Sequence, residues 1–160
     1  MQNGLLMIYT HHVTTPSYVA LGLALRALGR GWRVSIIHFT RDFECLCEVA
    51  KSSRLESSLK CRAFGSADRS VGRSAANDEA AQVTAAWQSA RRAIESRAFQ
   101  LVVLDELMDP LSRGLLDLDQ VVQFFKERPR DVTILITGPD LPELLLEAAD
   151  LVTNMVDVTP

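Results

Sequence analysis

Glycine is scarce in this chain of 160 residues, and its distribution is uneven. Only 8 glycines are present, and none lies between Gly4 and Gly22. Basic residues are not in excess either, because 17 Lys and Arg stand against 20 Asp and Glu for a net charge of -3. That balance gives no electrostatic reason to expect nucleic acid or an anionic membrane surface as a partner. No apolar run approaches the roughly 18 residues of a membrane-spanning helix, so we expect no membrane insertion.

Cysteine is also sparse, and no export signal precedes the first apolar segment. The three cysteines, Cys45, Cys47 and Cys61, cannot all pair with one another. The N-terminal residues have no positive flank of the kind that begins a signal peptide. We therefore expect reduced structural thiols rather than a metal site, and a cytoplasmic location.

The length fits one domain, which we expect to span residues 1–160. Short apolar runs predict strands, and apolar residues spaced by three and four predict helices. The expected strands are 4–10, 33–39, 59–64, 100–104, 132–137 and 151–158. The expected helices are 16–29, part of 42–59, 77–97, 118–125 and 142–149, and a polar surface loop is expected at 65–74.

Apolar strands that alternate with helices are typical of a parallel sheet covered on both faces. We therefore expect an α/β fold with a mostly parallel sheet. In such sheets, ligands bind outside the carboxyl ends of the strands. The candidate functional residues accordingly lie in four segments, 10–18, 38–42, 105–109 and 137–140.

The apolar strand that ends at residue 104 is followed directly by two carboxylates, Asp105 and Glu106. This arrangement resembles the Walker B pattern of nucleotide-binding proteins, in which the Asp holds Mg²⁺ and the Glu handles a proton or the metal shell. The pattern is short, so two solvated acids at a strand end are the competing interpretation.

The first strand-to-helix turn occupies the place of a phosphate-binding loop. Such a loop needs glycines, so that backbone amides point inward, and a lysine that meets the terminal phosphates. This turn has neither, and its proline removes a further amide from the helix start. Its hydroxyls and the positive end of the helix dipole would hold an anion only weakly. The candidate cofactor-binding residues of this turn are Thr10, His11, His12, Val13, Thr14, Thr15, Pro16, Ser17 and Tyr18.

Over residues 4–156 the chain resembles the ATP:corrinoid adenosyltransferases, the cob(I)alamin and cob(I)yrinic acid a,c-diamide adenosyltransferases of cobalamin metabolism. The matching stretches follow the family's order and spacing at 22–31, 33–39, 86–88, 101–107, 128–129, 136–138 and 149–153. The resemblance implies a P-loop-NTPase-like (RecA-like) fold and a homodimer. It also implies transfer of the 5′-deoxyadenosyl group of ATP to a Co(I) corrinoid, with Mg²⁺ and release of triphosphate.

The family's loop, G-N-G-K-G-K-T-T, is where this sequence departs from the resemblance. The family glycines fall on His11, Val13 and Thr15, the phosphate lysine on Pro16, and the metal-binding hydroxyl on Ser17. Only Ser17 keeps its chemistry. If ATP binds, the resemblance places Mg²⁺ on Ser17 together with Asp105 and Glu106.

Three histidines, His11, His12 and His38, are expected at the same sheet edge as Asp105 and Glu106. Neutral imidazoles beside carboxylates suit zinc or another borderline metal, or an axial bond to a corrinoid cobalt. The competing interpretation is that they are polar residues at strand ends, because adjacent histidines point to opposite sides of an extended chain.

Three hypotheses remain open. We favour a degenerate family member that binds a corrinoid, or that forms a dimer with itself or an active paralogue, and we assign no catalytic residue to it. The second hypothesis is an active adenosyltransferase with an altered nucleotide loop. The third is a module that binds a small ligand or a metal on the same scaffold.

Overall fold

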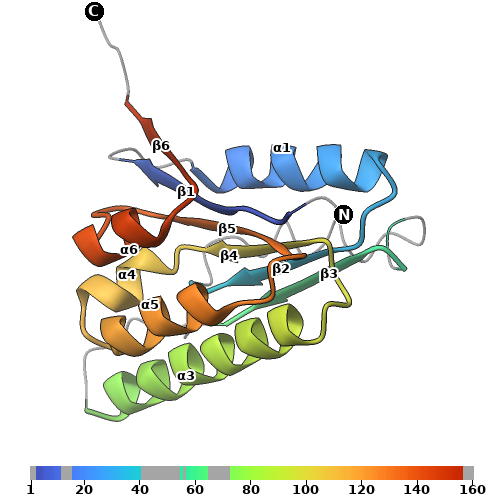
Figure 1. Cartoon of the computed structure of the whole chain (residues 1–160). Coiled ribbons are helices and arrows are strands. Elements are labelled where there is room, and N and C mark those ends of the chain that lie inside the picture. Colours follow the sequence, from blue (N-terminus) through green and yellow to red (C-terminus); the bar gives the residue numbers. More distant parts are fainter. Residues whose placement is uncertain (1–2, 12–15, 41–54, 56, 65–72, 157–160) are drawn as a thin grey trace, which may run out of the picture.

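The computed structural model describes residues 3–11, 16–40, 55, 57–64 and 73–156 (Figure 1). Within them, one six-stranded sheet has the order β3-β2-β4-β5-β1-β6, and each neighbouring pair of strands is parallel. The strands are β1 (Leu6–His11), β2 (Val34–His38), β3 (Leu59–Ala63), β4 (Leu101–Asp105), β5 (Thr133–Gly138) and β6 (Leu151–Met155). The predicted α/β fold with a parallel sheet is confirmed.

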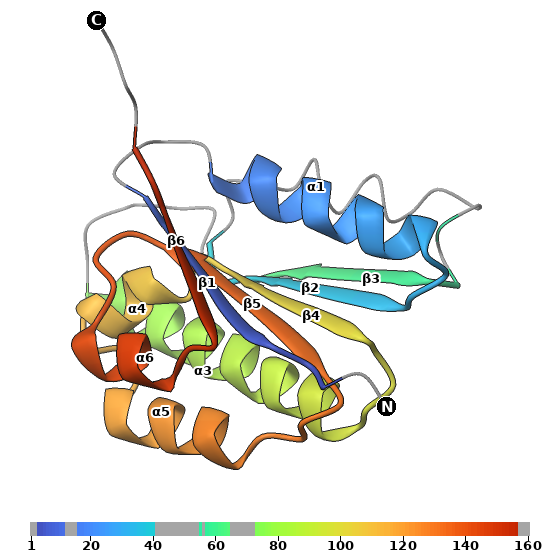
Figure 2. The same ribbon diagram turned by 45° about the horizontal axis from the view of Figure 1, so that its top comes forward.

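Helices cover both faces of this sheet (Figures 1 and 2). One face carries α1 (Pro16–Gly29); the other carries α3 (Arg73–Glu95), α4 (Met108–Ser112), α5 (Leu118–Glu127) and α6 (Glu143–Ala148). Ala20, Ala24 and Ala27 are the residues that α1 buries against the sheet, and their small side chains let the helix backbone approach the strands. No helix in the described part of the chain is long and apolar enough to cross a membrane.

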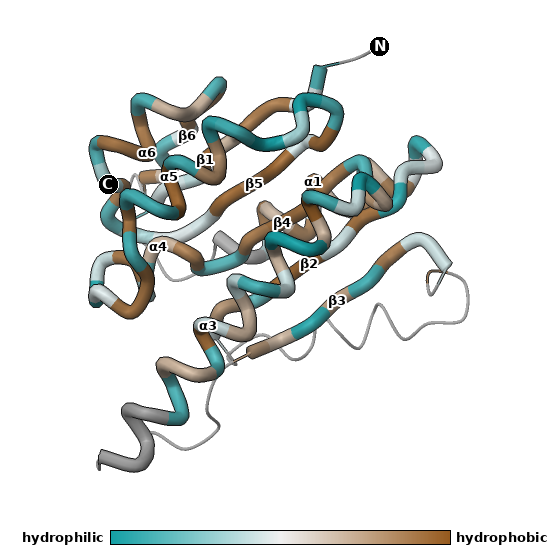
Figure 3. Tube along the Cα trace, turned by 60° about the horizontal axis from the view of Figure 1, so that its bottom comes forward, coloured by the Kyte–Doolittle hydropathy of each residue, from teal (hydrophilic) through white to brown (hydrophobic). Residues whose placement is uncertain are grey.

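The core consists of two apolar layers, one on each side of the sheet. Along β4, Val102 and Leu104 face the layer under α3 and α5, whereas Leu101 and Val103 face the layer under α1. Both β2 and β4 are buried at every position, because they are interior strands with helices on both sides. Figure 3 shows the result as largely hydrophobic β4 and β5, against an α3 that alternates between hydrophilic and hydrophobic turns.

Helix ends follow local signals that the sequence predicts. The chain leaves α1 at Gly29, and Gly31 has a φ of 78°, a left-handed conformation that glycine adopts without strain. The turn is closed by hydrogen bonds from the Gly31 amide to the Leu28 carbonyl at 2.8 Å and from the Trp32 amide to the Ala27 carbonyl at 3.1 Å. The predicted end of this helix is therefore confirmed.

Among the described elements, two boundaries differ from the sequence predictions by three residues or more, and one short helix was not predicted. The third helix, α3, begins at Arg73 rather than at residue 77, because residues 73–76 include helix formers that do not extend its apolar stripe. The five-residue α4 was not predicted; Pro110 lies in its first turn, where a missing backbone N–H breaks no helical hydrogen bond. The strand predicted to reach residue 158 ends at Met155. Most of the segment 42–59 and of the loop 65–74 lies outside the described residues.

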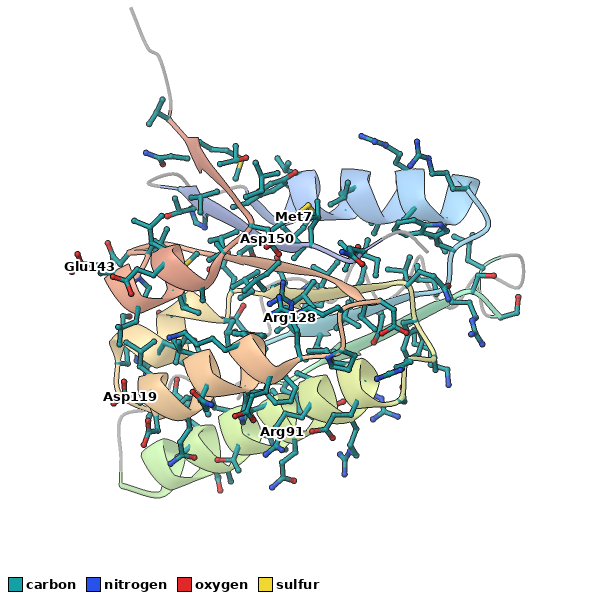
Figure 4. The ribbon with its side chains drawn as sticks, viewed as in Figure 1. Met7, Arg91, Asp119, Arg128, Glu143 and Asp150 are labelled. Atoms are coloured by element: carbon teal, nitrogen blue, oxygen red, sulfur yellow. The ribbon has the colours of Figure 1, made fainter. Side chains whose placement is uncertain are left out.

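A buried arginine joins the end of α5 to the start of two strands (Figure 4). The guanidinium of Arg128 donates to the Phe125 carbonyl at 2.8 Å and to a carboxylate oxygen of Asp150 at 2.6 Å. The same Asp150 oxygen accepts the Leu6 amide at 2.7 Å. Burial lowers the pKa of Arg128 below its ordinary value. This network holds the start of β6 next to the start of β1. It thereby also helps to position the carboxyl ends of the two strands.

The expectation of reduced thiols is wrong for Cys61. In the structure this residue, on β3, is bonded in a disulfide. Whether two thiols come within bonding distance depends on the placement of their backbones, which spacing in the sequence does not reveal. Cys45 and Cys47 lie outside the described residues.

Candidate functional site

The candidate site lies at the carboxyl edge of the sheet, where four central strands end side by side. In a parallel sheet all carboxyl ends share one edge, and the register keeps them level. His38 pairs with Asp105 across β2 and β4, and Thr10 pairs with Gly138 across β1 and β5. The first histidine, His11, follows Thr10 as the last residue of β1.

Asp105 is the centre of this edge, and it is almost completely buried. One of its carboxylate oxygens lies 2.8 Å from Nδ1 of His38, and the other accepts the Thr137 hydroxyl at 2.8 Å. Both partners are fully buried. A carboxylate removed from water needs such partners, because desolvation without hydrogen bonds costs several kcal/mol. The ends of β2, β4 and β5 therefore converge on one buried acid.

Glu106, the next residue, turns the chain out of the sheet. Its φ is 60°, a conformation uncommon for a residue with a side chain and concentrated at functional or strained sites. Its backbone amide donates to the Thr137 hydroxyl oxygen at 3.0 Å, so that one hydroxyl supports both acids. Its side-chain Oε1 lies 3.4 Å from Nε2 of His11, and both side chains are largely buried.

A glycine at the end of β5 brings α4 close to this pair of acids. Gly138 has a φ of 144°, and a Cβ there would lie 2.8 Å from the Cβ of Met108, the first residue of α4. Only a residue without a side chain allows this approach. The close packing of α4 against β5 supports the turn at Glu106.

The structure thus brings together four of the predicted site residues as two acid–imidazole pairs. His38 contacts Asp105, and His11 contacts Glu106. Thr10 is also at this edge, buried between β5 and β6, whereas Tyr18 is exposed on α1. Four predicted residues of the first turn and two side chains at the start of α1 lie outside the described parts of the chain; they are His12, Val13, Thr14, Thr15, and the side chains of Pro16 and Ser17.

Thr137 is a site residue that the sequence reasoning did not single out. Its segment was assigned to the ligand edge, but its contact with both acids depends on β5 lying next to β4. A hydroxyl at the carboxyl end of an apolar strand is the signal that could have identified it.

The residues of this edge do not fit a magnesium–triphosphate complex. Both oxygens of Asp105 are engaged by protein groups, and Glu106 faces an imidazole. The described residues contain no group of three or more His, Cys, Asp or Glu that could hold a metal ion. The first turn, 10–18, also has no glycine and no cationic Lys or Arg.

The fold class is supported by a solved structure. The flagellar accessory protein FlaH from Methanocaldococcus jannaschii superimposes with a TM-score of 0.59 at 15% identity, over 96% of this chain and 72% of that one. At that identity the likeness shows the fold alone. Together with the parallel sheet, it agrees with the predicted P-loop-NTPase-like (RecA-like) α/β class.

Comparison of sequences identifies the family. Residues 2–159 match the family described as ATP:corrinoid adenosyltransferase BtuR/CobO/CobP. A corrinoid adenosyltransferase of Pseudomonas aeruginosa is 30% identical over 96% of this chain and 75% of its own length. One from Escherichia coli K12 is 27% identical over 96% of this chain and 77% of its own length. The chain belongs to the ATP:corrinoid adenosyltransferase family, as the resemblance predicted.

Proposed function

We propose that this chain is a degenerate member of its family, which binds a corrinoid but does not carry out ATP-dependent adenosyl transfer. The observation that supports the proposal is that each acid at the end of β4 contacts a histidine from another strand. His38 engages Asp105, and His11, on a position where the family loop has glycine, faces Glu106. His11, which stands where the family loop has a glycine, therefore also places an imidazole ring beside Glu106.

The energetics of Asp105 oppose direct coordination of a magnesium ion. To bind a metal, this carboxylate would have to give up its hydrogen bond to Thr137 or its contact with His38, both at 2.8 Å. A hydrogen bond to a charged group contributes about 1.5 to 3 kcal/mol, and the partner left behind would be buried. Nothing in the first turn compensates for this loss, since that turn has no basic side chain to attract a triphosphate.

The proposed ligand is a corrinoid, because the family acts on corrinoids and the fold is retained. A subunit that holds a corrinoid without a nucleotide cradle needs another protein to complete the chemistry. We accordingly propose that it works as a homodimer or as a dimer with an active paralogue. Sedimentation of the purified chain, alone and mixed with an active adenosyltransferase, tests this part separately; two non-interacting monomers would contradict it.

Calorimetry tests the binding proposal directly. Reduced cobalamin, handled without oxygen, and ATP with Mg²⁺ are titrated separately into the purified chain. The Pseudomonas aeruginosa relative serves as the positive control for both ligands. We expect saturable heat with the corrinoid and only heat of dilution with the nucleotide. Saturable ATP binding would favour an active enzyme with an altered loop, and no corrinoid binding would refute the proposal.

We also propose a cytoplasmic location, although a disulfide such as that of Cys61 persists chiefly in oxidising compartments. Cell fractionation followed by immunoblotting of each fraction tests the location. Recovery of the chain outside the cytoplasmic fraction would contradict the proposal.

A further inference from the structure

A cavity of about 340 Å³ lies at the amino edge of the sheet, opposite the acid–imidazole pairs. It is bounded by the second half of α1 and by the starts of β1, β4 and β5. Its volume falls within the range of about 300 to 1,000 Å³ that is typical of small-molecule sites. The proposed function assigns nothing to this edge.

The inner wall of this amino-edge cavity is apolar. Met7 of β1, labelled in Figure 4, lies on the α1 side of the sheet, together with Leu101 of β4. Leu23 and Ala27 of α1 complete this wall, and Trp32 adds a large aromatic side chain. Such a wall favours a ligand with a flat hydrocarbon body, which gains roughly 25 cal/mol for each Å² removed from water.

The rim of the cavity carries an excess of positive charge. Arg26, on the last turn of α1, and Arg30, directly after the helix, both line it, and neither forms an ion pair within the described part of the chain. The only acid that lines it is Asp131, which already lies 3.6 Å from Arg97. Two guanidinium groups are thus left to meet a negative charge, and guanidinium is the side chain best suited to carboxylates, sulfonates and phosphates.

The side chain of Gln100 forms part of the polar floor of the cavity, and a backbone amide holds it in place. The side-chain carbonyl of Gln100 accepts the Arg33 amide at 2.8 Å. With this oxygen engaged, the cavity-lining amide of Gln100 has its NH₂ group left as a donor. Donors and cations therefore dominate the polar part of the lining, and an anionic ligand is favoured over a cationic one.

We propose that the amino-edge cavity binds a small amphipathic anion, with a flat apolar body against Trp32 and a negatively charged group between Arg26 and Arg30. This site lies at the opposite edge of the sheet from the acid–imidazole pairs, and its test does not depend on whether the chain binds a corrinoid.

Two dyes that differ in charge test this proposal. The probe is 8-anilinonaphthalene-1-sulfonate, and its uncharged counterpart is N-phenyl-1-naphthylamine, which has the same ring system without the sulfonate. The chain has 2 tryptophans. The variant Trp87→Phe leaves Trp32 as the sole energy donor, and its aromatic packing against Phe124 and Phe125, across the sheet, is kept by phenylalanine.

We expect saturable binding of the anionic dye, with energy transfer from Trp32. The double variant Arg26→Gln/Arg30→Gln should weaken it by about tenfold or more, because charge-assisted contacts are lost. The affinity for the neutral dye should stay unchanged. Arg92→Gln, which removes an exposed arginine from α3, is the matched control and should change neither dye. Equal affinity for the anion in the double variant, or no energy transfer from Trp32, would overturn the proposal.

Discussion

Thr137→Val is predicted to destabilise the fold through the two acids that its hydroxyl supports. Valine has nearly the same shape, so the substitution removes a hydroxyl group without opening a cavity. The hydroxyl is fully buried; it donates to Asp105 at 2.8 Å and accepts the Glu106 amide at 3.0 Å. The first loss involves a charged acceptor and is worth about 1.5 to 3 kcal/mol, and the second leaves a backbone amide without this acceptor. Together they predict a decrease of about 2 to 4 kcal/mol in the free energy of unfolding.

Urea denaturation followed by circular dichroism measures this decrease, and thermal melts check it. A domain of this size shifts by roughly 3 °C per kcal/mol, so the melting temperature should fall by about 6 to 12 °C. Thr133→Val is the control on the same strand, because in the described structure the Thr133 side chain makes no hydrogen bond. Thr137→Ser keeps the hydroxyl and should recover most of the stability. If Thr137→Val stays within about 0.5 kcal/mol of the parent, the hydroxyl does not support the acids as described.

Three further substitutions test other parts of the account. Asp150→Asn removes the charge that faces buried Arg128 and should cost about 1 to 3 kcal/mol in urea denaturation; no change would mean that the pair does not hold the strand starts together. Gly138→Ala should cost about 2 to 3 kcal/mol, because φ is 144° and α4 leaves no room for a Cβ; a neutral result would show that α4 shifts freely. The hydrogen bond from Arg113 lowers the pKa of Glu79 below its usual value of 4.5. The pair therefore stabilises the fold above pH 4.5, and this stabilisation is lost as the pH falls through the lowered pKa. Glu79→Gln should therefore differ from the parent by less than about 1 kcal/mol near pH 7 and by nothing near pH 2; a difference that persists in acid would contradict this.

The sheet and the position of the site edge could be predicted from the sequence because both rest on strong local signals. Interior strands covered on both faces must be apolar throughout, as 101–104 and 134–136 are. The carboxyl ends of parallel strands meet at one edge, which is why His11, His38 and the two acids were expected together. His11 and His38 lie at this edge, and His12 lies outside the described residues; the pairing of each histidine with an individual acid required the register.

Features that depend on the order of strands or on packing could not be predicted. Thr137 reaches both acids only because β5 lies between β4 and β1. The disulfide at Cys61 depends on the distance between two backbones, and the amino-edge cavity on segments that are far apart in the sequence. α4 has only five residues, which is too short to show a helical period.

The central claim, a family member without ATP-dependent turnover, is tested most directly by an adenosylation assay. The purified chain is mixed with ATP, Mg²⁺ and a chemically reduced corrinoid, and the absorption spectrum is followed for formation of a Co–C bond. The Pseudomonas aeruginosa relative, assayed in parallel, shows that the reagents support the reaction. We predict that the spectrum with this chain matches the protein-free control at every time point. Growth of the adenosylated-corrinoid spectrum in proportion to the concentration of this chain would contradict the account.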